Sequence, residues 1–182
     1  PVSLFGRRFP NTSLPNSEQT HINFQCALST MFSMCDSHCH LESMKQYSPA
    51  QHPHLLHITC GYSNASNREN FEIAKNNPNV FCCLGIAPQE AMKFENLRES
   101  VQEAEKFIVA CSKAAPNKLV AIGEIGLDFH WAKTQEEKEK QKECFLSMLS
   151  LAKSLSLPIV IHSRNSMDEV IGVLTAHSGI KT

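Results

Sequence analysis

The chain has 182 residues and a net charge of -1, which is enough length for one domain with a sizeable core. The near-neutral charge argues against nucleic-acid binding through bulk positive charge, although a local basic groove is compatible with it. The eight cysteines include no CxxC pair, and Cys82 and Cys83 are adjacent in an apolar run. This spacing argues against a disulfide framework. It favours buried, reduced thiols in a cytoplasmic protein.

Residues 1–33 differ in character from the rest of the chain. They are rich in proline, asparagine, serine and threonine, so we expect a disordered N-terminal extension without a core of its own. The stretch from Ile22 to Met34 is interrupted by polar residues and predicts neither a membrane span nor a signal peptide. We expect the native domain to begin at Met31 or Met34, and to occupy residues 34–182.

From residue 34 onward, apolar runs alternate with amphipathic stretches. Strands are predicted over residues 34–40, 54–60, 80–86, 119–124 and 157–162, and helices over residues 66–76, 95–114, 135–156 and 166–176. The connection over residues 42–53 is short and broken by proline, so its helix is expected to be reduced or absent. The alternation predicts an α/β fold of parallel βαβ units. An open doubly wound sheet and a (β/α)8 barrel both fit this pattern. A complete barrel needs about 250 residues, more than this chain has, so composition alone leaves the choice open.

Chemistry-bearing residues follow several of these strands. His38 and His40 are two apart, so on a strand they point to the same side and can bind one metal ion together. Glu124, between Gly123 and Gly126, is predicted to close its strand, and His162 to close the last one. Taken singly, Glu124 can cap a loop. One histidine of the His38–His40 pair, or His162, can be a structural residue. Their convergence at carboxyl ends of parallel strands favours a site for Zn²⁺, Mn²⁺ or a similar divalent ion.

Three segments together resemble the TatD family of metal-dependent deoxyribonucleases, which are amidohydrolase-like barrels. They are residues 36–41 (Asp-Ser-His-Cys-His-Leu), residues 123–128 (Gly-Glu-Ile-Gly-Leu-Asp), and residues 141–145 leading into residues 157–164 (Leu-Pro-Ile-Val-Ile-His-Ser-Arg). The resemblance runs from about Met34 to about Leu174. It implies a TIM-type (β/α)8 barrel of which about five of the eight βα units are present.

The resemblance also implies roles for individual residues. His38 and His40 would bind one divalent ion, Glu124 would bridge two ions as the catalytic carboxylate, and His162 would bind the second. The ions would be Mg²⁺, Mn²⁺ or Zn²⁺. Arg164 would contact substrate phosphate, with a structural ion pair as the alternative.

The loop after Glu124 carries two further candidates. His130 and Trp131 are expected to line the substrate groove, and a base stacked on Trp131 would stabilise binding by about 1–3 kcal/mol. Packing of Trp131 at the barrel rim is the alternative.

The sequence departs from the family pattern in two ways that bear on activity. Ala87 stands where the family has a histidine in a Gly-x-His-Pro segment. The family's histidine on strand six and aspartate after strand eight would fall beyond Thr182, so a C-terminally truncated barrel is expected.

Three functions remain compatible with these residues. The first is hydrolysis of DNA phosphodiester bonds, with DNA as substrate and no membrane partner. The second is metal-dependent hydrolysis of a small amide, ester or lactone, because this barrel supports many chemistries. The third is an inactive truncated fragment.

Overall fold

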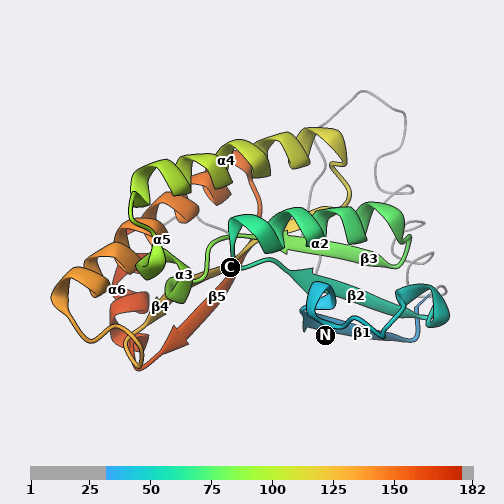
Figure 1. Ribbon diagram of the computed structural model, residues 1–182, viewed down its shortest axis with the longest axis horizontal. Coiled ribbons are helices and arrows are strands. Elements are labelled where there is room, and N and C mark those ends of the chain that lie inside the picture. The colour runs from blue at the N-terminus through green and yellow to red at the C-terminus, as the bar shows by residue number, and fades with distance from the viewer. Residues whose placement is uncertain (1–31, 178–182) are drawn as a thin grey trace. The chain divides into compact units, whose positions relative to one another are not determined.

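The computed structural model describes residues 32–177 (Figure 1). The chain divides into two units, Pro1–Ser33 and Met34–Thr182. The prediction of a disordered N-terminal extension rests almost wholly on residues 1–31, which lie outside the described residues.

The second unit is built on a five-stranded sheet in which every neighbouring pair is parallel, in the order β1-β2-β3-β4-β5. The strands are β1 (Met34–Cys39), β2 (Leu55–Cys60), β3 (Val80–Leu84), β4 (Leu119–Asp128) and β5 (Ile159–Arg164). Each strand therefore pairs with the strands that precede and follow it in the chain. This is the arrangement of successive βαβ units in a TIM-type barrel, and it confirms the predicted incomplete barrel over the open doubly wound sheet, whose strand order reverses.

Helices connect the strands from β2 onward, and their ends follow local sequence. The helices are α2 (Asn64–Asn76), α3 (Pro88–Lys93), α4 (Leu97–Ala114), α5 (Gln135–Leu155) and α6 (Met167–Ala176). A capping box starts α2 at Ser63, and a second one starts α5 between Thr134 and Glu137. These side chains satisfy amide groups that have no partner inside the helix. Between β1 and β2 there are only two 3-10 turns, η1 (Leu41–Ser43) and η2 (Pro49–Gln51), in agreement with the predicted loss of that helix.

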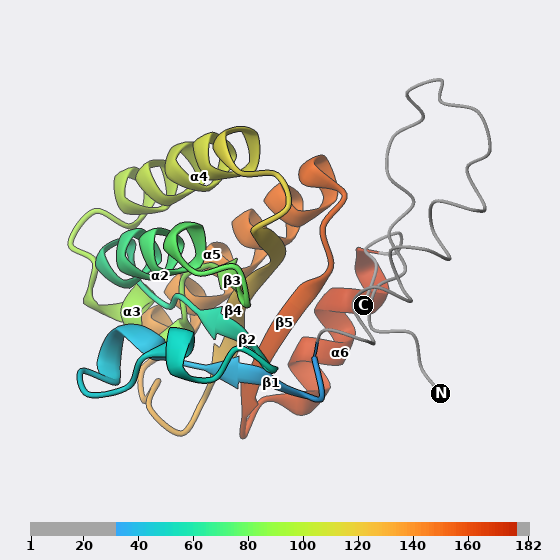
Figure 2. The same ribbon diagram turned by 90° about the vertical axis from the view of Figure 1, so that its right-hand side faces the viewer.

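The main core lies between one face of the sheet and the covering helices α2, α4 and α5 (Figures 1 and 2). Fully buried side chains from the helices, such as Ile108 and Met148, meet Leu84 and Ile122 of the strands there. The opposite face carries a smaller cluster of Cys60, Cys83 and Ala121, with Val160 packed against it. In a TIM-type fold this second face is the barrel interior.

The two edge strands are less covered than the strands between them. The first five residues of β1 are exposed, and β5 is half-buried along its length except for exposed Arg164. Met34 at the start of β1 is 66% exposed to solvent.

Several predicted boundaries were wrong in ways that matter for the site. β4 continues to Asp128, so Glu124 lies inside the strand, and β5 continues to Arg164 beyond His162. The short helix α3 was not predicted at all. Gly123 allows close packing between strands, because an added Cβ would lie 2.6 Å from the Cβ of Val160.

Within residues 32–177, no helix is both long and apolar enough to cross a membrane.

Candidate metal centre

Two candidate ligands lie where the pairing of strands is irregular. The register between β1 and β2 shifts between Asp36 and Cys39, and the register between β4 and β5 shifts between Ile122 and Ile125. His38 and Glu124 lie within these two irregular stretches. Such irregularities in strand pairing are common beside functional sites.

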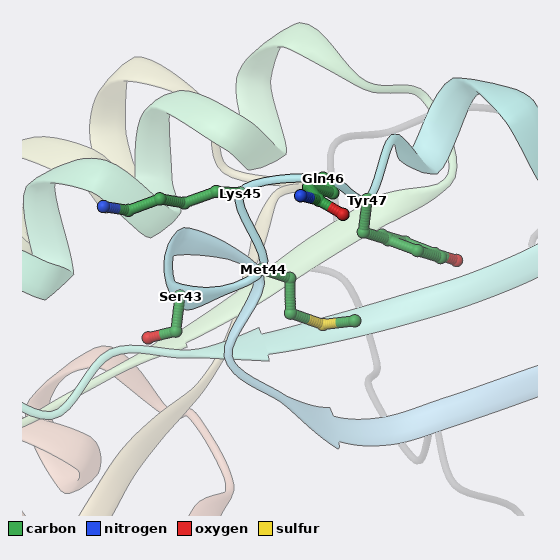
Figure 3. A pocket seen from close by; sticks show the side chains of 5 residues that line it. All are labelled: Ser43, Met44, Lys45, Gln46 and Tyr47. Atoms are coloured by element: carbon green, nitrogen blue, oxygen red, sulfur yellow. The ribbon is translucent and has the colours of Figure 1, made fainter.

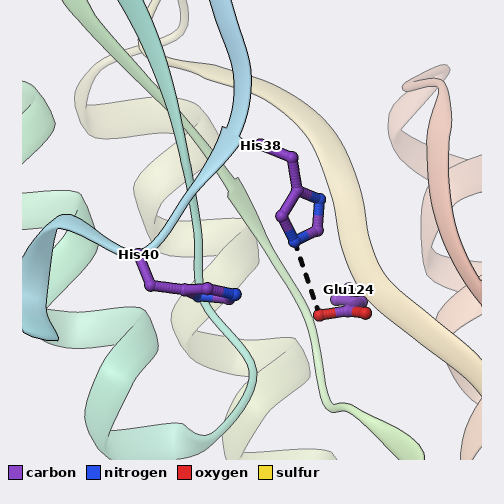
Figure 4. A group of neighbouring side chains, drawn as sticks. All are labelled: His38, His40 and Glu124. Carbon is purple, nitrogen blue, oxygen red and sulfur yellow. Dashed lines mark ion pairs between the residues drawn. The ribbon is translucent and has the colours of Figure 1, made fainter.

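His38, His40 and Glu124 come together on one side of the sheet (Figure 4). One ligand atom from each lies within 4.8 Å of the others. His38 Nε2 is 3.7 Å from Glu124 Oε2, and the two imidazole rings meet edge to face with centroids 5.2 Å apart. Two neutral nitrogens and one carboxylate at this spacing match the donor set of a divalent transition-metal ion.

His40 is held in an orientation that leaves one nitrogen available. Its Nδ1 lies 2.8 Å from the carbonyl oxygen of Cys60, which can only accept, so Nδ1 is the donor. Nε2 then carries the lone pair, as in the histidine ligands of many metal sites. Glu42 lies behind the ring, with Oε1 3.9 Å from Nδ1.

His162 joins the cluster through Glu124. Its Nδ1 lies 2.8 Å from Glu124 Oε1, and its Nε2 lies 2.9 Å from Asp128 Oδ2. The hydrogen bond to Glu124, and then the one to Asp128, raise the pKa of His162 against the opposing effect of burial. The hydrogen bond from His162 in turn lowers the pKa of Glu124. His162 therefore links the two carboxylates through its two ring nitrogens.

The predicted substrate-binding residues lie around this cluster rather than in it. Arg164 is exposed at the end of β5, and its backbone carbonyl accepts a hydrogen bond of 2.8 Å from the Phe129 amide. His130 is half-buried in the turn after β4, and Trp131 beside it is 53% exposed. The rings of His130 and Trp131 meet edge to face at 4.9 Å. Trp131 lines a shallow pocket together with Gln89, Met92, Lys93 and Glu137.

Sequence reasoning missed the role of Asp128, although it recognised the segment that contains this residue. Asp128 is fully buried and accepts a hydrogen bond from His162. In the sequence it ends a glycine-rich segment, where an aspartate is typical of a turn, so its contact with His162 was not predicted. Gln89 and Gln141, its other side-chain partners, come from α3 and α5. A polar residue on the buried stripe of a helix, as Gln141 is, was the available signal.

A second pocket has no connection to this chemistry. It is lined by the consecutive residues Ser43 to Tyr47, at the end of η1 and in the loop that follows (Figure 3). Its walls are the side chains of one exposed loop, without a converging set of polar groups. We assign it no function.

Comparison with known proteins places this geometry in a family. A family model described as TatD related DNase matches residues 35–181. The chain is 32% identical over 117 residues to the uncharacterized metal-dependent hydrolase YabD of Bacillus subtilis, a match that covers 64% of this chain and 42% of that protein. It is 34% identical over 97 residues to the deoxyribonuclease TATDN3 of Homo sapiens, covering 52% of this chain and 35% of that protein.

Solved structures agree with the fold. The TatD homologue YJJV of Escherichia coli superimposes with a TM-score of 0.64 at 24% identity, covering 79% of this chain and 56% of that one. A TatD family hydrolase of Entamoeba histolytica gives a TM-score of 0.61 at 19% identity, covering 80% and 55%. The chain thus spans only about a third to just over half of the length of these relatives.

Proposed function

This chain belongs to the TatD family of related DNases, and from that premise we propose that it is a metal-dependent hydrolase that cleaves DNA phosphodiester bonds with two divalent cations. The observation that carries the proposal is the convergence of four side chains, which come from β1 and the residue after it, from β4 and from β5. His38, His40 and Glu124 offer ligand atoms within 4.8 Å of one another, and His162 lies 2.8 Å from the same carboxylate.

The residues fit a pair of cations chemically. His38 and His40 supply two nitrogens on one side of Glu124, and His162 supplies a nitrogen on the other side. The carboxylate has one oxygen toward each side, as a bridging ligand requires. Its lowered pKa keeps it ionised at neutral pH.

Divalent cations at such a site lower the pKa of water and stabilise charge on phosphate oxygens. The chain's own residues then have simple tasks. His38 and His40 would hold one cation, Glu124 would contribute its negative charge, and His162 would bind through a deprotonated nitrogen. Arg164 at the exposed end of β5 would contact a phosphate, and Trp131 would stack against a base.

Hydrolysis of a small amide, ester or lactone is the second candidate. It is favoured by Ala87, which is buried at the start of α3 and brings no imidazole to the site where the family has a histidine. A missing polar contact to phosphate would affect a nuclease more than an enzyme for a small neutral substrate.

The test compares substrates on purified protein loaded with Mg²⁺, Mn²⁺ or Zn²⁺. We expect cleavage of single-stranded DNA that EDTA abolishes, and that Glu124→Gln abolishes as well. Glu72→Gln is the matched control, because Glu72 is an exposed carboxylate that pairs with Lys75 on α2. Hydrolysis of p-nitrophenyl esters without cleavage of DNA would favour the second candidate. Glu124→Gln protein that cleaves DNA as fast as Glu72→Gln protein would contradict the metal centre.

A further inference from the structure

Asp128 is a buried carboxylate that the proposed chemistry does not use directly. It ends β4 and has no solvent-exposed surface. A buried carboxylate is costly unless hydrogen bonds replace its water, so a protein that keeps one must satisfy both oxygens. The partners of the two oxygens differ, and this difference indicates what Asp128 does.

The first oxygen and the backbone of Asp128 fix its position. Oδ1 accepts hydrogen bonds from the amides of His130 at 3.1 Å and Trp131 at 3.3 Å. Gln141, which is fully buried on α5, accepts from the Asp128 amide at 2.8 Å and donates to its carbonyl oxygen at 3.2 Å. The turn therefore holds the carboxylate through Oδ1, and α5 holds the backbone of Asp128 through Gln141.

The second oxygen faces the metal centre. Oδ2 lies 2.9 Å from His162 Nε2 and 2.6 Å from Gln89 Nε2, and an ionised carboxylate oxygen accepts from both. Any rotation of the His162 imidazole ring, including a 180° flip, would break the hydrogen bond between Nε2 and Asp128 Oδ2. Its Nδ1 is thereby directed at Glu124, 2.8 Å away.

We propose that Asp128 is a positioning residue for the metal centre: it holds the Nε2 proton of His162 so that Nδ1 is presented as a ligand beside Glu124. A carboxylate behind a histidine ligand fixes the ring and raises its basicity, and the loss of such a partner lowers metal affinity about 10–100-fold. The inference rests on the proposed function, because it assigns Asp128 to the same centre. The alternative is that Asp128 only caps the turn through Oδ1 and has no part in the metal centre.

Asp128→Asn separates these two roles. The amide oxygen can still accept from the His130 and Trp131 amides, whereas the amide nitrogen in place of Oδ2 cannot accept from His162. We expect the Co²⁺ affinity of the weaker of the two sites to fall about 10–100-fold, with a changed visible Co²⁺ spectrum because a ligand is displaced. Gln89→Leu is the control, since it removes the other donor to Oδ2 and leaves the His162 bond in place. We expect Gln89→Leu to retain the wild-type Co²⁺ spectrum.

The outcomes distinguish the inference from the proposed function. Folded Asp128→Asn protein with wild-type Co²⁺ affinity and spectrum would overturn the positioning role alone. Wild-type protein that binds no Co²⁺ would overturn both. If Asp128→Asn does not fold, ¹⁵N NMR of the Zn²⁺-loaded wild type decides: a protonated Nε2 and an unprotonated Nδ1 in His162 support the role, and the reverse tautomer overturns it.

Discussion

Gly126 is the position at which a single methyl group tests whether strand packing sets the metal centre. It lies in β4 opposite His162 of β5, and its φ of 143° is in a region that other residues rarely adopt. A Cβ built at this position would overlap the carbonyl oxygen of His162 and lie 3.0 Å from its carbonyl carbon. Because the obstacle is backbone, it cannot rotate away, and Gly126→Ala must displace β5.

Two costs add in this variant. Forcing an extra methyl group into a packed region costs about 1–3 kcal/mol, and a residue with a side chain at this φ costs about 1–3 kcal/mol more. The total of roughly 2–6 kcal/mol is a large part of the 5–15 kcal/mol by which domains are typically stable. At roughly 2–4 °C per kcal/mol for a chain of this size, a loss of about 4 kcal/mol lowers Tm by about 8–16 °C.

The assay is thermal unfolding followed by circular dichroism, together with Zn²⁺ titration. Gly172→Ala is the matched control, because Gly172 is exposed on α6 and a Cβ there meets nothing within 4 Å. The same chemical change should stabilise the protein there by about 0.5–1 kcal/mol. Displacement of β5 carries His162 away from Glu124, so we expect Gly126→Ala to weaken Zn²⁺ binding as well. An unchanged Tm and Zn²⁺ affinity in Gly126→Ala would refute the reasoning.

Three further outcomes are expected. Glu124→Ala should abolish DNA hydrolysis with little change in circular dichroism, and undiminished turnover would remove Glu124 from the mechanism. In metal-free protein, urea unfolding should show the largest contribution of the Glu124–His162 pair between about pH 4.5 and pH 6.5. The lowered pKa of Glu124 makes its contribution disappear as pH falls below this window, and the raised pKa of His162 makes its contribution disappear as pH rises above it; a flat difference from Glu124→Gln would contradict the pair. Trp131→Ala should weaken binding of single-stranded DNA by about 1–3 kcal/mol in a fluorescence titration without changing Zn²⁺ affinity, and equal DNA affinity would favour rim packing.

Local patterns were sufficient to predict most elements of this fold. The apolar runs at residues 55–60 and 80–84 are strands, and the apolar stripe of α4, including Val101 and Ile108, is buried as its spacing predicts. Alternation along β1 placed Cys39 in the packing, where it is 8% exposed, and left His38 and His40 on the other side. These features depend on the period of a strand or helix, which the sequence contains.

The remaining features depend on contacts between distant segments. Glu124 between two glycines looked like a strand end, but the glycines let neighbouring backbones approach and the strand continues to Asp128. Six residues are too few for a helical period, so α3 was missed, and with it Gln89. The burial of Asp128 arises from α3, α5 and β5 together. No window of sequence around residue 128 contains these partners.

The contact between His38 and Glu124 has a consequence for how strongly the sheet must curve. Two strands, β2 and β3, separate β1 from β4, and at about 4.8 Å per strand a flat sheet would hold their backbones roughly 14 Å apart. The 3.7 Å between His38 Nε2 and Glu124 Oε2 therefore requires the sheet to curl until side chains on its concave face converge. If the proposed metal centre is correct, a variant that flattens the sheet should bind a divalent cation more weakly even though His38 and Glu124 are unchanged.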